Sequence, residues 1–171
     1  MRTLYARKFR LAHQGASTVT DRNSQAVYLV VGKWGRRNDV LSVYAISGKL
    51  LAEIKQTGFG IFPCFKLYSH QQLVGNLRRY HFGKKDLLLV NKLNWMIVGD
   101  IYSFNYRIYH GRDLIMQLSE VSMLTGNYLE LKISAVENES LCLCIVAILD
   151  YFAQKPVQHL KKNYNLNIRF D

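Results

Sequence analysis

Residues 138–154 read NESLCLCIVAILDYFAQ, and Pro156 follows one lysine later. Within this segment, residues 141–149 carry no charged or strongly polar side chain on any helical face. Asn138 or Ser140 can act as the N-cap, and a proline prevents the helix from continuing. The segment therefore predicts a helix that is apolar all round, which must be buried in a protein core or lie in a membrane.

The length of this helix favours burial inside the protein over membrane insertion. About 17 residues at 1.5 Å each span roughly 25 Å, which is shorter than a hydrocarbon core of about 30 Å. Asp150 would also lie at an unfavourable depth in a bilayer. We expect its carboxylate to have a structural partner, either a cation or backbone amides. Asp100 is expected to bond a neighbouring strand or turn.

Outside this helix, the chain reads as short strands in which apolar and polar residues alternate. The clearest period-2 pattern covers residues 128–136, and a Gly-containing turn at Ser47-Gly48 joins two strands into a hairpin. Segment 11–25, rich in Ser, Thr, Gln and Asn, is expected to be a loop. Strands are predicted at 4–10, 26–32, 40–46, 50–57, 61–68, 72–80, 86–90, 95–101, 104–110, 113–121 and 128–136, with a twelfth near 164–170.

A helix that is apolar on every side constrains how these strands can be arranged. A flat sheet covers one side of such a helix, whereas a sheet curled around it covers all sides and also removes exposed sheet edges. Eleven or twelve strands make a barrel too wide for side chains alone to fill. The sequence therefore predicts a mainly β protein, a closed antiparallel barrel of about 12 strands that encloses the helix at about 138–154.

Composition supports one folded domain covering residues 1–171. Hydrophobic residues make up 49% of the chain, which excludes disorder, and 11 Gly with 2 Pro exclude a collagen-like or linker sequence. The formal net charge is +11. Residues 1–100 hold 16 basic and 5 acidic groups, and residues 101–171 hold 7 of each. A surplus of this size attracts anionic partners such as phospholipid or nucleic acid, although it is equally compatible with a solvated basic surface.

Motifs of catalysis and metal binding are absent from the sequence. The five histidines are isolated, and no HExxH, CxxC or GxSxG pattern occurs. Cys142 and Cys144 are separated by about 200° on a helix, so they do not suit a shared zinc ion. With Cys64 they read as thiols in a reducing compartment. We predict no enzymatic activity and no cofactor, while a catalytic site assembled in space stays an alternative. No signal peptide is visible, which predicts a cytoplasmic protein or one attached peripherally to a membrane.

Basic side chains are the best candidates for a binding site. Some occupy outward strand positions, and others lie in loops beside an aromatic ring. Cations and rings at such positions suit an anionic membrane surface, and they would equally suit nucleic acid. The candidate ligand-binding residues are Lys33, Trp34, Arg36, Arg37, Lys55, Lys66, Arg78, Lys84, Lys85 and Arg107.

Four stretches of the chain resemble the LURP-one-related family. They are DVLSVYAISGKLLAEIKQT (39–57), FPCFKLYSHQQLVGNLRR (62–79), WMIVGDIYSFNYRIY (95–109) and SLCLCIVAILDYF (140–152). The family is similar in fold to the Tubby C-terminal domain and to phospholipid scramblases. The resemblance implies a barrel of about twelve strands around a hydrophobic C-terminal helix, and it brings no agreed catalytic residues.

Together these observations predict a non-enzymatic binding protein. We expect peripheral binding of anionic phospholipid headgroups through the basic face. The alternative is an adaptor for nucleic acid or for a protein that uses the same face. The sequence leaves the oligomeric state open.

Overall fold

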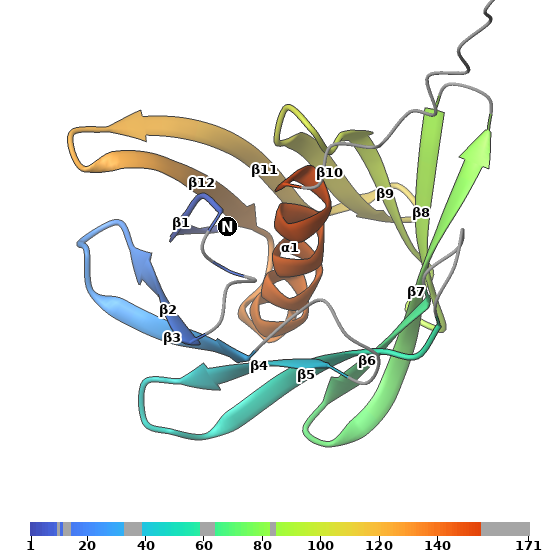
Figure 1. The fold of residues 1–171 in the computed structure, drawn as a ribbon, viewed down its shortest axis with the longest axis horizontal. Coiled ribbons are helices and arrows are strands. Elements are labelled where there is room, and N and C mark those ends of the chain that lie inside the picture. The colour runs from blue at the N-terminus through green and yellow to red at the C-terminus, as the bar shows by residue number, and fades with distance from the viewer. Residues whose placement is uncertain (10, 12–14, 33–38, 59–63, 83–84, 155–171) are drawn as a thin grey trace, which may run out of the picture.

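A computed structural model describes residues 1–9, 11, 15–32, 39–58, 64–82 and 85–154, and Figure 1 shows their arrangement. Twelve strands form one closed antiparallel barrel in chain order, and β1 closes the ring by pairing with β12. The strands are β1 (Arg2–Arg7), β2 (Gly15–Asp21), β3 (Ala26–Gly32), β4 (Val40–Ala45), β5 (Leu50–Gln56), β6 (Cys64–Ser69), β7 (Gln72–Phe82), β8 (Lys85–Asn91), β9 (Trp95–Asp100), β10 (Asn105–His110), β11 (Asp113–Met123) and β12 (Gly126–Ile133).

The apolar segment forms the helix α1 (Glu139–Gln154), which follows a short 3-10 turn, η1 (Val136–Asn138). Figure 1 shows α1 standing inside the ring of strands. Residues 142–149 have no exposed surface, and Leu141 is 6% exposed. The helix contacts β4, β5 and β6, among other strands. The predicted closed barrel with an enclosed helix is therefore confirmed.

Alternation along the strands supplies the inner layer of the core. In β12, Leu129, Leu131 and Ile133 are fully buried, while Glu130 and Lys132 between them are partly exposed. The same alternation buries Ala52 and Ile54 in β5 and turns Glu53 between them outward. Because side chains point to opposite faces at each step of a strand, a strand with this alternation presents one apolar row to α1.

The prediction of a loop at 11–25 is wrong, because β2 lies within it. Val19 is the one fully buried side chain of this strand, so its sequence shows little apolar alternation. Backbone pairing with β1 and β3 holds β2 in the sheet: Val19 lies opposite Ala6 on one side and Tyr28 on the other. β2 therefore completes the twelve strands. The strand expected near 164–170 lies outside the described residues, as do residues 61–63 of the strand expected at 61–68.

Buried carboxylates tie both ends of α1 to the barrel. At the first residue of the helix, Glu139 accepts hydrogen bonds from Arg2 (3.2 Å) and from the Tyr28 hydroxyl. Near the other end, Asp150 accepts the backbone N–H of Phe9 at 2.9 Å. Asp150 was expected to have either a cation or backbone amides as its partner, and the structure shows a backbone amide. Asp100, as expected, accepts backbone N–H groups of the turn that follows it.

Candidate functional site

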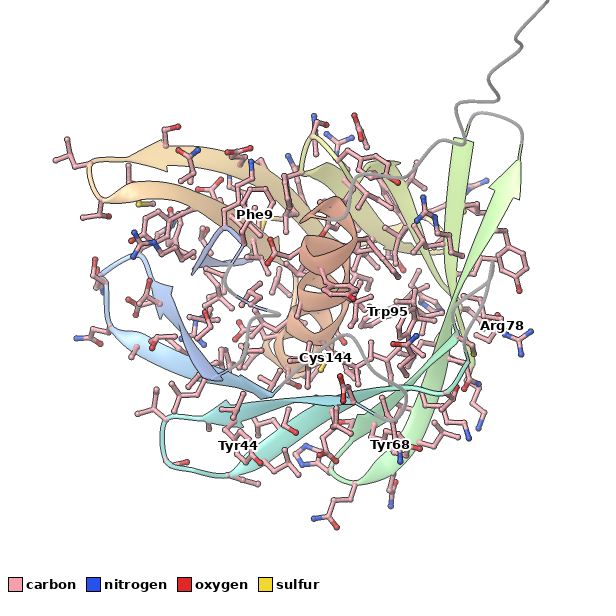
Figure 2. All side chains as sticks on the ribbon, in the orientation of Figure 1. Phe9, Tyr44, Tyr68, Arg78, Trp95 and Cys144 are labelled. Atoms are coloured by element: carbon pink, nitrogen blue, oxygen red, sulfur yellow. The ribbon has the colours of Figure 1, made fainter. Side chains whose placement is uncertain are left out.

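Three of the predicted cations lie side by side on the outside of the barrel. Lys55 in β5 is directly opposite Lys66 in β6, and Arg78 in β7 is opposite Cys64, two residues before Lys66. On each strand the residue just before the cation is buried (Ile54, Phe65 and Leu77), so the three side chains point outward. Figure 2 shows Arg78 extending away from the barrel. We call Lys55, Lys66 and Arg78 the basic strip.

The charges of the basic strip are not neutralised by the described part of the chain. Directly opposed side chains in a sheet have Cβ atoms about 5 Å apart, so like charges at such positions repel each other. The ion pairs among the described residues are Arg2–Glu139, Lys8–Glu120 and Lys132–Glu130, and none involves the strip. Glu53, two residues before Lys55, accepts a hydrogen bond from Ser42. An external anion would therefore relieve the repulsion within the strip.

Arg78 supplies the one guanidinium group of the strip. Hydrogen bonding to Cys64, and then to Tyr80, raises the pKa of its guanidinium group. Cys64 is half-buried on the neighbouring strand β6. Tyr80 lies on β7, two residues after Arg78. A guanidinium is a planar, permanently charged group suited to phosphate or carboxylate oxygens.

Beside the basic strip, the outer face of two strands is apolar. Leu87 and Leu89 of β8 and Met96 and Val98 of β9 point outward, because Leu88, Val90, Trp95 and Ile97 fill the inward positions. Met96 is 38% exposed and Val98 is 44% exposed. We call Leu87, Leu89, Met96 and Val98 the apolar wall.

The apolar wall is bordered on both sides by arginine and tyrosine. On β7, Arg78 lies opposite Leu89, and Tyr80 lies opposite Leu87. On β10, Tyr109 lies opposite Met96, and Arg107 lies opposite Val98. A shallow depression of about 370 Å³ lies next to Val98 and Arg107, between the ends of β9 and β10. Arg78 thus belongs to the basic strip and also forms one edge of the apolar wall.

The remaining predicted residues lie outside the basic strip. Arg107 is exposed on β10, three strands from Arg78, across the apolar wall. Lys85 begins β8. Five other predicted residues lie outside the described part of the chain: Lys33, Trp34, Arg36, Arg37 and Lys84.

Inside the barrel, the thiols of Cys142 and Cys144 and the hydroxyl of Tyr106 are buried in the hydrophobic core. Burial raises the pKa of the Cys142 and Cys144 thiols, and burial followed by the charge of Asp150 raises the pKa of the Tyr106 hydroxyl. These groups are therefore protonated at neutral pH. Among the residues that the structure describes, no three His, Cys, Asp or Glu side chains are grouped so that they could hold a metal ion. In that same part of the chain, no helix has the length and apolarity needed to cross a membrane.

Sequence reasoning missed the apolar wall, although its signal was present. Residues 87–90 read LLLV and residues 95–98 read WMIV, so these strands are apolar on both faces. Strands of that composition are typically covered on both sides. Strand alternation identified the inner face of β8 and of β9. It did not raise the question of what covers their apolar outer face.

Comparison with known proteins places this barrel in a family. The model of the LURP-one-related family matches residues 2–150. The chain belongs to the LURP-one-related family. Among relatives of this LURP-one-related chain, the uncharacterized protein YxjI of Bacillus subtilis is 24% identical over 147 residues, covering 86% of this chain and 91% of YxjI. An X-ray structure of a protein from Arabidopsis thaliana has a similar fold, with a TM-score of 0.59 at 14% identity, covering 88% of this chain and 91% of that one.

Proposed function

We propose that this protein is a non-enzymatic binding module that docks peripherally on anionic phospholipid through the basic strip. The observation that carries the proposal is the placement of Lys55, Lys66 and Arg78 on three adjacent strands, facing outward, with no ion pair to a described carboxylate. Cations held near an anionic surface each strengthen binding, and an arginine can bind two phosphate oxygens at once.

The position of the strip favours binding over catalysis. An enzyme brings titratable groups together in a pocket that excludes water. The basic strip instead lies on the convex outer wall of the barrel, which suits contact with an extended surface. Its neighbour is the apolar wall, and aliphatic side chains next to cations match the headgroup and acyl regions of a lipid. Nucleic acid would instead use aromatic rings on which bases can stack, and the residues of the apolar wall are aliphatic.

Liposome binding by a strip variant tests this function. Lys55→Gln, Lys66→Gln and Arg78→Gln together should weaken binding to vesicles of phosphatidylserine and phosphatidylcholine on the order of a hundredfold. The matched control is Arg22→Gln, Lys49→Gln and Arg112→Gln, which removes three exposed cations from turns and so lowers the net charge equally. Co-sedimentation at about 0.1 M salt measures both, and the control should bind nearly as well as the wild-type protein.

Two results would contradict the proposal. Equal losses in the strip variant and its control would mean that total charge, and not this strip, governs binding. Tight binding of a single-stranded oligonucleotide at physiological salt, without vesicle binding, would favour the nucleic-acid alternative. Binding should weaken steeply as salt rises in either case, because exposed charges interact over about 8 Å at physiological ionic strength.

A further inference from the structure

We propose that the apolar wall inserts into the lipid bilayer when the protein docks, with Arg78 and Arg107 at headgroup level on its two sides. This inference rests on the proposed function and specifies how the membrane is contacted. Insertion predicts that some of the affinity for vesicles comes from apolar contact and does not depend on ionic attraction.

The composition of β8 and β9 is the first argument. Most strands of the barrel alternate, as β12 does with Glu130 and Lys132 on its outer face. The outward positions of the apolar wall instead carry two leucines, a methionine and a valine. Exposing contiguous apolar side chains to water is unfavourable, and such patches on soluble proteins mark sites that contact a membrane or another protein.

The border of the wall is the second argument. One row of residues that lie opposite each other on successive strands crosses β7 to β10, and it consists of Arg78, Leu89, Met96 and Tyr109. The next row carries Tyr80 and Leu87 on β7 and β8, and Val98 and Arg107 on β9 and β10. Each row thus has two aliphatic residues between an arginine and a tyrosine, and the order reverses from one row to the next. Tyrosine and arginine are the side chains that occupy the interface beside an inserted apolar group.

Continuity with the basic strip favours a bilayer over a protein partner. Arg78 belongs to both surfaces, so cations and aliphatic side chains form one outer face spanning β5 to β10. Adjacent strands are about 4.8 Å apart, so β7 and β10 are about 14 Å apart. An anionic bilayer would neutralise the charges that form no ion pair within the described residues and would also cover the aliphatic side chains, because its headgroups lie next to its acyl chains.

Replacement of the exposed wall residues by polar residues of similar shape tests insertion. Met96→Gln with Val98→Thr should lower vesicle binding about tenfold, which corresponds to about 1.4 kcal/mol. The loss should persist at about 1 M salt, where charge attraction is screened to about 3 Å. The matched control is Met123→Gln with Leu124→Gln at the tip of the β11–β12 hairpin. Those residues are 41% and 109% exposed, and they lie on the opposite side of the barrel (Figure 1).

An environment-sensitive fluorophore reports directly on insertion. With Cys64→Ser as background, Val98→Cys labelled with NBD should shift to the blue on anionic vesicles, whereas labelled Leu124→Cys should not. Cys142 and Cys144 are fully buried and will not compete for the label.

The outcomes separate this inference from the proposed function. Loss of binding in the strip variant with an unshifted label at position 98 would overturn insertion and leave peripheral docking in place. No vesicle binding by the wild-type protein would overturn both. A blue shift that appears with rising protein concentration, without lipid, would assign the wall to contact with a second copy of the chain and overturn the inference.

Discussion

Helix α1 and the strand pair β8 and β9 are both apolar on more than one face, and they have different surroundings. Residues 141–149 of α1 are apolar all round, and all of them are buried inside the barrel. Strands β8 and β9 are also apolar on both faces, yet Met96 and Val98 on their outer face are 38% and 44% exposed. The comparison teaches that an apolar pattern indicates how many faces need a partner, without indicating whether the same chain supplies it.

A charge placed in each region should show the difference most sharply. Val146→Asp puts an unpaired carboxylate at a position with no exposed surface, and should lower the free energy of unfolding by several kcal/mol. That loss could remove most of a typical stability of about 5–15 kcal/mol. Val98→Asp makes the same change on the outer wall and should alter stability little. Urea unfolding measures both, and an unchanged midpoint for Val146→Asp would refute the enclosed helix.

Alkaline pH should lower the free energy of unfolding, because the barrel interior holds buried thiol and tyrosine groups. Burial raises the pKa of Cys142, Cys144 and Tyr106, and burial with the hydrogen bond to Glu139 raises the pKa of Tyr28. The folded protein therefore holds protons that the unfolded chain releases near pH 9 for thiols and near pH 10 for tyrosines. Stability is complete below these values and falls as pH rises above them, by roughly 1 kcal/mol per pH unit for each group.

Urea unfolding at pH 8, 9, 10 and 11 follows this loss of stability. Cys144→Ala removes one of the buried thiols, so its stability should decline less steeply than that of the wild-type protein. Figure 2 shows Cys144 inside the barrel. An unfolding free energy that stays constant from pH 8 to pH 11 would contradict the burial of these groups.

The smallest change in stability is expected at the outer wall. Met96→Gln with Val98→Thr should shift the free energy of unfolding by about 0.5 kcal/mol or less, because exposed positions away from caps and cores tolerate substitution. Thermal unfolding without lipid measures the shift. A loss of several kcal/mol would mean that the wall packs against the protein itself, and it would remove the basis for membrane insertion.

Local pattern was sufficient for most of the fold. The helix predicted at 138–154 is found at Glu139–Gln154, and the strand at 26–32 is found with those bounds. β2 was missed because its place depends on backbone pairing with β1 and β3, which leaves almost no apolar signature. Of the candidate site, Lys55, Lys66 and Arg78 were correctly expected to point outward.

The apolar segment 138–154 and the alternating strands were enough to require a barrel around a helix, because hydrophobic periodicity is a local property of the chain. The grouping of Lys55 with Lys66 and Arg78 was not contained in that pattern. It depends on strand register, since a slip of one residue would turn a side chain to the other face. The same register brings Arg78 beside Leu89 and Met96 beside Tyr109. Closure of the barrel around α1 leaves each strand one inner face, and so the second apolar face of β8 and β9 is left on the outside.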